Sequence, residues 1–196
     1  MTIKAALEQF KQGHPIIVFD HESRENEGDI ILSAKDATPE KVNWITKYAR
    51  GLICVALSEA RAEQLDLSLM PRRGIKNSCM FLQSVEAAQD VTTGISAFDR
   101  SKTIQWLADE NRGKNDFITP GHIFPCLASK NGLKERQGHT EAGVVLCEMT
   151  DLPEAALICE IMHDDGTMKN YKQLALFAKK WQLNLISIKD IMDYNG

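Results

Sequence analysis

The residue types best suited to chemistry are concentrated in a charged run, residues 22–29. The run reads Glu-Ser-Arg-Glu-Asn-Glu-Gly-Asp, so it offers four carboxylates and one guanidinium within eight positions. Carboxylate oxygens are ligands that hard divalent cations prefer, and a neighbouring arginine can hold oxyanions or hydroxyl groups. The same composition also suits an exposed turn, because runs of charge are common on protein surfaces. The run by itself therefore leaves a metal-binding loop and a solvated turn both open.

A second polar group lies where a helix is expected to begin. Residues 136–141 read Arg-Gln-Gly-His-Thr-Glu and precede an apolar pattern with helical spacing. Backbone N–H groups at a helix start, with the Thr140 hydroxyl and Arg136 nearby, make a natural phosphate site. A helix cap is the alternative role for Thr140. His139 is either an ordinary surface histidine or a metal ligand.

Two further residues stand at strand boundaries. His122 follows Pro120-Gly121 before a short apolar run, and Glu160 follows the very apolar run 155–159. A carboxylate beside such a run is a candidate for a raised pKa, which suits general acid/base chemistry near neutrality. An exposed strand end is the alternative for Glu160. The segment 164–166, Asp-Asp-Gly, lacks the rest of a calcium loop, so we predict a turn there.

These groups need elements to position them, and the apolar pattern predicts alternating helices and strands. Helical spacing predicts helices over residues 3–10, 39–49, 104–108, 142–149 and 174–181. Short apolar runs predict strands over residues 16–19, 30–32, 52–57, 81–85, 123–127, 156–159 and 185–188. The charges between residues 20 and 29 would then lie on a connection between two strands. The helix over residues 142–149 is predicted to be amphipathic.

The predicted fold class is α+β. The mixture of apparent hairpins with βα alternation favours a single domain over residues 1–196, built as a mixed β-sheet covered by helices, and not a purely parallel barrel. A chain of 196 residues, 43% of them hydrophobic, can bury a core without metal or disulfide support. The five cysteines are odd in number and widely spaced, so we expect reduced, mostly buried thiols.

Composition also excludes several partner classes. The formal net charge is -4, and no dense stripe of basic residues offsets it, so we do not expect nucleic acid as a partner. No apolar run approaches the length of a membrane span, and the N-terminus lacks the pattern of a secretory signal. We therefore expect a cytoplasmic protein that does not enter a membrane.

Taken together and in order, the polar segments resemble one enzyme family. The segments are residues 24–29, 92–97 with Asp99 and Arg100, 120–125, 138–142, and Cys159-Glu160 followed by 164–168. They are similar to those of the 3,4-dihydroxy-2-butanone 4-phosphate synthases of riboflavin biosynthesis, and they run through nearly the whole chain. The resemblance supports a functional role for each polar group more strongly than the residues of that group do by themselves.

The resemblance implies a lyase that converts D-ribulose 5-phosphate into 3,4-dihydroxy-2-butanone 4-phosphate and formate. It implies magnesium and no organic cofactor, and homodimers whose active sites lie at the subunit interface. A histidine ligand also suits manganese, so we expect either metal to work. The alternative is a diverged paralogue that acts on another sugar phosphate by metal-assisted enolisation and elimination. A third hypothesis is a sugar-phosphate sensor without turnover.

The resemblance also assigns roles to residues. Glu25 and His139 would bind the metal, while His122 and Glu160 would be catalytic. The substrate contacts would be Arg24, Glu25, Asp29, Thr93, Arg136, Gln137, Gly138, His139, Thr140 and Glu160. Cys54 matches a position near the substrate, and Glu22 and Glu27 stay without an assigned role.

The chain departs from the family pattern at three places. Residues 77–83 read Asn-Ser-Cys-Met-Phe-Leu-Gln, where the family usually has a Gly-Thr-x-Phe-Thr-Val type of strand. His21 and Ser23 stand where acidic residues are common, and Thr119 stands where arginine usually precedes Pro-Gly-His. We expect these changes to alter pocket shape and rate. No cysteine-rich GTP cyclohydrolase II segment follows, so we predict a single-function protein.

Overall fold

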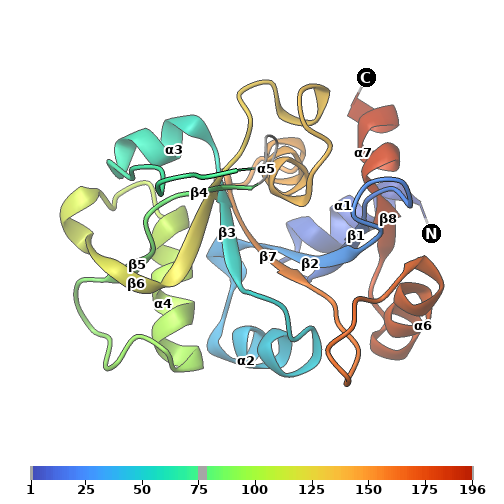
Figure 1. The fold of residues 1–196 in the computed structure, drawn as a ribbon, viewed down its shortest axis with the longest axis horizontal. Helices are drawn as coiled ribbons and strands as arrows, with labels where there is room; N and C mark the ends of the chain where they lie inside the picture. The colour runs from blue at the N-terminus through green and yellow to red at the C-terminus, as the bar shows by residue number, and fades with distance from the viewer. Residues whose placement is uncertain (1, 75–78, 196) are drawn as a thin grey trace.

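The predicted strands assemble into one mixed sheet in the computed structural model, which describes residues 2–74 and 79–195 (Figure 1). The eight strands are ordered β4-β6-β3-β7-β2-β1-β8, with β5 paired to β6 beside this path. The pairs β1–β8 and β3–β6 are parallel and the other pairs are antiparallel, as expected for a mixed sheet. The strands are β1 (Ile16–Phe19), β2 (Gly28–Ser33), β3 (Cys54–Leu57), β4 (Met80–Phe81), β5 (Val85–Ala87), β6 (Phe117–Leu127), β7 (Ala155–Glu160) and β8 (Leu185–Ser187).

Helices cover both faces of the sheet. One core contains side chains of α1, α5 and α7, and the other contains side chains of α2, α3, α4 and α6. Because both faces are covered, the central strands β1, β2 and β3 are buried along their whole length. The helices are α1 (Ile3–Lys11), α2 (Pro39–Tyr48), α3 (Glu59–Gln64), α4 (Ala97–Ala108), α5 (His139–Met149), α6 (Tyr171–Trp181) and α7 (Ile188–Asn195), with short 3-10 turns at Ala34–Asp36, Lys114–Asp116 and Gly132–Lys134.

Helix α2 begins at a side-chain cap. Thr38 is the N-cap, its side chain accepts a hydrogen bond from the Lys41 N–H, and Pro39 occupies the first turn. At the other end of the chain, the Asn170 and Gln173 side chains form a capping box at the start of α6. Such caps satisfy backbone donors that would otherwise lack a partner.

Six of the seven predicted strands have different bounds in the structure, and the largest extension is that of β6, which begins at Phe117 and not at Ile123. The strand predicted over 52–57 begins only at Cys54. The strand predicted over 81–85 is two strands, β4 and β5; between them, Leu82 forms a bridge with Leu69 while its N–H still donates to the Pro125 carbonyl oxygen of β6. The charged connection is shorter than predicted, since β2 already begins at Gly28 and contains Asp29. The departures at Asn77 and Ser78 lie outside the described residues.

Several helices differ from the sequence prediction: α3 was not predicted, and α4 begins at Ala97 and not at Ile104. The prediction of an amphipathic α5 is wrong, because every residue from 139 to 147 is buried. Its Gly143 lies against the sheet, where an added Cβ would come 3.0 Å from the Ala156 Cβ. The helix α7, which follows β8, was not predicted. Its signal was present, since the Ser187 hydroxyl accepts from the Asp190 N–H while Asp190 accepts from the Ser187 N–H.

Within the described residues, every helix is too short or too polar to cross a lipid bilayer.

Candidate active site

The register of the sheet gathers polar residues at one end. Asp29 on β2 is the direct partner of Glu160 on β7, so both side chains point to the same face. On the other side of β7, Cys54 is the partner of both Ile158 and Phe124. His122 precedes Phe124 by two residues and Glu160 follows Ile158 by two, so both lie at this end of the sheet. Strand β3 lies between the two strands that carry them.

The charged run is an ordered loop, and Asp20 organises it. The Asp20 carboxylate is buried and accepts hydrogen bonds from Arg24 Nη1 at 2.9 Å and from the Glu25 N–H at 3.0 Å. Its second oxygen accepts from the Glu27 N–H at 3.1 Å. Arg24 Nη1 also lies 2.5 Å from Glu25 Oε2. These hydrogen bonds fix the backbone of the loop at Glu25 and Glu27.

A candidate metal centre forms between this loop and the start of α5. Ligand atoms of Glu25, Glu27 and His139 lie within 4.8 Å of one another. The His139 Nε2 is 3.1 Å from the Val18 carbonyl oxygen, which can only accept, so Nε2 carries the proton and Nδ1 keeps its lone pair. Burial lowers the pKa of His139 to about 4, and the Arg24 charge acts in the same direction. His139 is therefore neutral at pH 7, the form that binds metals.

Several carboxyl groups lie close together beside this candidate metal centre. Burial, with the charges of Glu25 and Glu160, raises the pKa of Glu27 to about 7. Burial also raises the pKa of Asp29 well above its usual range, and Glu160 and Glu27 contribute. The Asp29 Oδ1 has no hydrogen-bond partner among the described residues and lies 3.6 Å from His139 Nδ1. These oxygens suit a divalent cation, because it would offset the charge that burial disfavours.

Glu160 is fixed by the turn before β3. Its Oε2 accepts a hydrogen bond from the Leu52 N–H at 2.9 Å. Gly51 makes this possible, because a Cβ at that position would lie 2.4 Å from Glu160 Oε2 and 2.5 Å from the Glu160 carbonyl oxygen. Two carboxylates near it, Asp29 and Glu27, have a raised pKa.

The predicted phosphate site at the start of α5 is built around Glu141. This buried carboxylate accepts from Arg136 Nη1 at 2.7 Å and from the Ser129 N–H at 3.0 Å. Gly138, and not Thr140, is the N-cap, and a Cβ there would lie 2.2 Å from Arg136 Nη1. Thr140 is buried, and its Oγ1 lies 3.9 Å from Cys79 Sγ. The capping alternative for Thr140 is therefore wrong.

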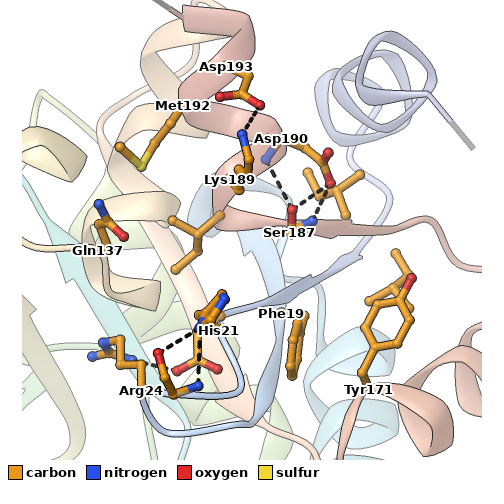
Figure 2. Close-up of a pocket in the computed structure, with 15 residues that line it drawn as sticks. Phe19, His21, Arg24, Gln137, Tyr171, Ser187, Lys189, Asp190, Met192 and Asp193 are labelled. Atoms are coloured by element: carbon orange, nitrogen blue, oxygen red, sulfur yellow. Dashed lines mark hydrogen bonds and ion pairs between the residues drawn. The ribbon is translucent and has the colours of Figure 1, made fainter.

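Gln137 and Arg24 line a cavity of about 770 Å³ beside the charged loop. Figure 2 shows Arg24 and His21 at one side of this cavity, Lys189, Asp190 and Asp193 of α7 opposite them, and Phe19 near Tyr171. Glu25, Asp29, His139 and Glu160 are not among its lining residues. The cavity is thus adjacent to the metal centre and distinct from it.

His122 lies in a separate part of the site. Its Nδ1 is hydrogen-bonded to Glu86 Oε1. The loop that carries Thr93 packs beside this pair, and Thr93 itself is exposed. Asp99 holds the loop, because its carboxylate accepts from the Thr92 N–H and hydroxyl and from the Gly94 N–H.

Several residues of the site escaped the sequence reasoning. They are Asp20, Gly51 and Glu86, and each acts by holding another residue; Glu141, which does the same, stood in the predicted polar group without a role. Asp20 follows a predicted strand directly, and Glu86 is one outward carboxylate in a short apolar strand, so neither has a distinctive sequence pattern. Glu27 was left without a role and joins the predicted ligands Glu25 and His139.

Comparison with known proteins assigns the family. The profile described as 3,4-dihydroxy-2-butanone 4-phosphate synthase matches residues 4–194. The chain belongs to this family. The 3,4-dihydroxy-2-butanone 4-phosphate synthase of Campylobacter jejuni is 43% identical over 99% of this chain and 57% of its own length. The riboflavin biosynthesis protein RibBA of Bacillus subtilis is 47% identical over 98% of this chain and 48% of its own length.

This chain thus spans about half the length of these two synthase relatives. The synthase of Agrobacterium fabrum differs, because this chain covers 91% of it at 42% identity. Among solved structures, a 3,4-dihydroxy-2-butanone 4-phosphate synthase in complex with two magnesium ions matches with a TM-score of 0.95 and 33% identity, over 99% of this chain and 96% of that one. The Candida albicans synthase matches with a TM-score of 0.93 and 41% identity, over 100% and 98%. The α+β fold of the synthase family is therefore confirmed.

Proposed function

We propose that this chain converts D-ribulose 5-phosphate into 3,4-dihydroxy-2-butanone 4-phosphate and formate, a step of riboflavin biosynthesis, and is therefore a lyase. Family membership supports the reaction. The relatives from Campylobacter jejuni and Agrobacterium fabrum, which match nearly the whole chain, are named 3,4-dihydroxy-2-butanone 4-phosphate synthase. The single observation that carries the proposal is the meeting of Glu25, Glu27 and His139 beside the Asp29–Glu160 pair. These groups supply metal ligands and proton carriers for a reaction that repeatedly moves protons along a sugar skeleton.

Glu25, Glu27 and His139 would hold a divalent cation, magnesium or manganese, without an organic cofactor. The two magnesium ions of the related synthase support the binding of a divalent cation. A bound cation supplies electrostatic stabilisation of the oxyanion that enolisation creates. The orphaned Asp29 Oδ1 and the neutral His139 fit such a cation.

Residues of the chain would bind and orient the substrate. Arg136, with Thr140 and the N–H groups at the start of α5, would hold the phosphate away from the reacting carbons. Arg24, Asp29, Thr93, Gln137 and Gly138 would contact the rest of the sugar phosphate. Glu160 would move protons at the carbon skeleton, because it lies at the end of β7 with its Oε2 fixed by the Leu52 N–H. His122 would serve as the second proton carrier.

We also propose that residues 1–196 form one synthase domain and that the protein works in the cytoplasm. We further propose that it is a homodimer with active sites at the subunit interface. Exposed apolar side chains surround the His122 part of the site and support the dimer. Ile95 follows Gly94, Ile118 is the strand partner of Glu86, and Phe98 is 71% exposed on α4. His122 is 46% exposed at this margin. Light scattering tests the dimer, and a monomer at micromolar concentration would refute it.

A formate assay tests the reaction. The protein is incubated with D-ribulose 5-phosphate and Mg²⁺ or Mn²⁺, with a chelator in parallel samples. Formate release that stops with the chelator is expected. No release with either metal would refute the proposed function.

A diverged paralogue that acts on another sugar phosphate is the second candidate. It is favoured by Cys79, which stands in the atypical segment and lies 3.9 Å from the Thr140 hydroxyl of the phosphate site. Product analysis with several pentose and tetrose phosphates separates the two candidates. A clear preference for D-ribulose 5-phosphate would count against the paralogue.

A further inference from the structure

Strand β6 contains a bulge that directs His122 toward β5. Val85 is the register partner of Ile123, whereas the next residue, Glu86, is the partner of Ile118. Residues 119–122 therefore have no partners in this ladder and form the bulge. The bulge lies against β5, because the Gly121 N–H donates to Ser84 Oγ and a Cβ on Gly121 would lie 2.0 Å from the Val85 carbonyl carbon.

This arrangement places one carboxylate on His122. Val85 and Ala87 are buried, so the Glu86 side chain between them points to the opposite face of the strand. There Glu86 Oε1 hydrogen-bonds His122 Nδ1, and the Glu86 side chain is 12% exposed while that of His122 is 46% exposed. The carboxylate is thus enclosed and the imidazole remains accessible.

The loop at Gly94 packs against the His122–Glu86 pair. Gly94 has a φ of +83°, and a Cβ there would lie 1.2 Å from Glu86 Oε1 and 2.7 Å from His122 Nδ1. The three hydrogen bonds that Asp99 accepts from Thr92 and Gly94 keep the loop in this position. Glu86 is therefore held between β6 and this loop with its carboxylate directed at one ring nitrogen.

We propose that Glu86 is a positioning residue for His122 in the reaction proposed above. An ionised carboxylate only accepts, so Nδ1 carries the proton and Nε2 keeps its lone pair, directed away from Glu86. Nε2 takes a proton from the substrate, which gives an imidazolium that the Glu86 charge stabilises, and later returns that proton to a leaving hydroxyl. The catalytic consequence of this inference rests on the proposed function, whereas the His122 tautomer rests on the structure alone.

The test compares the wild type with Glu86→Gln. Glutamine has nearly the same shape but can either accept from or donate to Nδ1, so it does not select one tautomer. The matched control is Asp90→Asn, which removes a nearby exposed carboxylate whose partner is Lys102. Nitrogen NMR of ¹⁵N-histidine-labelled protein, assigned with His122→Asn, reports the His122 tautomer. Formate release reports kcat and KM.

We expect the Nδ1–H tautomer in the wild type and a mixture in Glu86→Gln. We expect kcat to fall about 10- to 100-fold in Glu86→Gln, with KM changed by less than about threefold, and Asp90→Asn to behave as the wild type. A wild-type His122 in the Nε2–H tautomer would overturn the proposal, even if the variant failed to fold. An unchanged kcat in a folded variant would also overturn it. If the wild type released no formate, the proposed function would fail while the NMR result still decided the tautomer.

Discussion

Asp29 and Glu160 face each other as register partners on β2 and β7, and Asp29 also lies 3.6 Å from His139 Nδ1 at the start of α5. Two carboxylates directly opposite each other destabilise a sheet, the more so when one is fully buried. The pair therefore indicates a position at which charge is held for function. A cation bound by Glu25, Glu27 and His139 would relieve the repulsion between Asp29 and Glu160.

Divalent metal should stabilise the folded protein through the predicted ligands. Addition of Mg²⁺ or Mn²⁺ at about 100 times its dissociation constant should raise the free energy of unfolding by about 2.7 kcal/mol. Glu25→Gln and His139→Asn should lose most of this gain, whereas Glu22→Gln, an exposed carboxylate outside the cluster, should retain it. Thermal unfolding with and without metal measures the effect. Equal stabilisation of all four proteins would contradict the assignment.

Without metal, Glu27 should make the protein less stable as the pH rises. An unfolded glutamate titrates near pH 4.3, but burial raises the pKa of folded Glu27 to about 7. Between these values the folded state binds more protons, so stability falls with increasing pH. Because Glu27 is partly exposed, we expect Glu27→Gln to gain about 1–2 kcal/mol over the wild type between pH 5 and pH 8.

The comparison with Glu27→Gln is needed because His139 acts in the opposite direction. Its pKa is lowered to about 4, so its contribution to stability increases as the pH rises toward the value of an unfolded histidine. Chelator-treated samples of both proteins, unfolded by urea at each pH, give the difference. A difference that stays constant with pH would show that Glu27 titrates normally.

Asp20→Asn should weaken metal binding without removing a ligand. The asparagine amide cannot accept all of the hydrogen bonds that the loop donates to Asp20, so Glu25 and Glu27 should lose their fixed positions. We expect a 10- to 100-fold loss of Mn²⁺ affinity, about the effect of removing groups that orient metal ligands. Titration calorimetry measures it. Ser23→Ala in the same loop is the control, and equal affinity of both variants would refute the role of Asp20.

Gly51→Ala should displace Glu160. The added Cβ would meet Glu160 Oε2 at 2.4 Å, so we expect kcat to fall at least about tenfold and stability to fall by about 1–3 kcal/mol. Gly113→Ala is the matched control, because no atom lies within 4 Å of a Cβ there. Formate release and thermal unfolding measure both. If Gly51→Ala were as active as Gly113→Ala, Glu160 would not need its observed position.

The sequence predicted the elements more reliably than their ends. Apolar periodicity located the strands that build the sheet, because burial on both faces leaves continuous apolar runs such as 16–19. It placed Asp29 outside β2, because a charged side chain in a strand breaks the apolar pattern. It also called α5 amphipathic, although contacts with the sheet, α1 and α7 bury all sides of that helix. Such contacts come from tertiary structure and leave no periodic signal.

For the site, sequence motifs located groups that would touch metal or substrate, and the structure added the groups that hold them. Glu25 and His139 come together as predicted, although their separation in sequence gives no measure of distance. The partners of these groups, such as Asp20 for the loop and Glu86 for His122, are single carboxylates with no motif of their own. They become recognisable only when strand register and hydrogen bonds are known. The roles assigned to all of these residues, including Glu25 and His139, stay predictions.

The most direct test of the central claim is NMR analysis of the products formed from D-ribulose 5-phosphate. In the presence of Mg²⁺ we predict that the protein forms formate and 3,4-dihydroxy-2-butanone 4-phosphate in equal amounts, and that Glu160→Gln or a chelator stops both. Unchanged substrate after incubation with folded, metal-loaded protein, or a product that retains all five carbons, would contradict the claim.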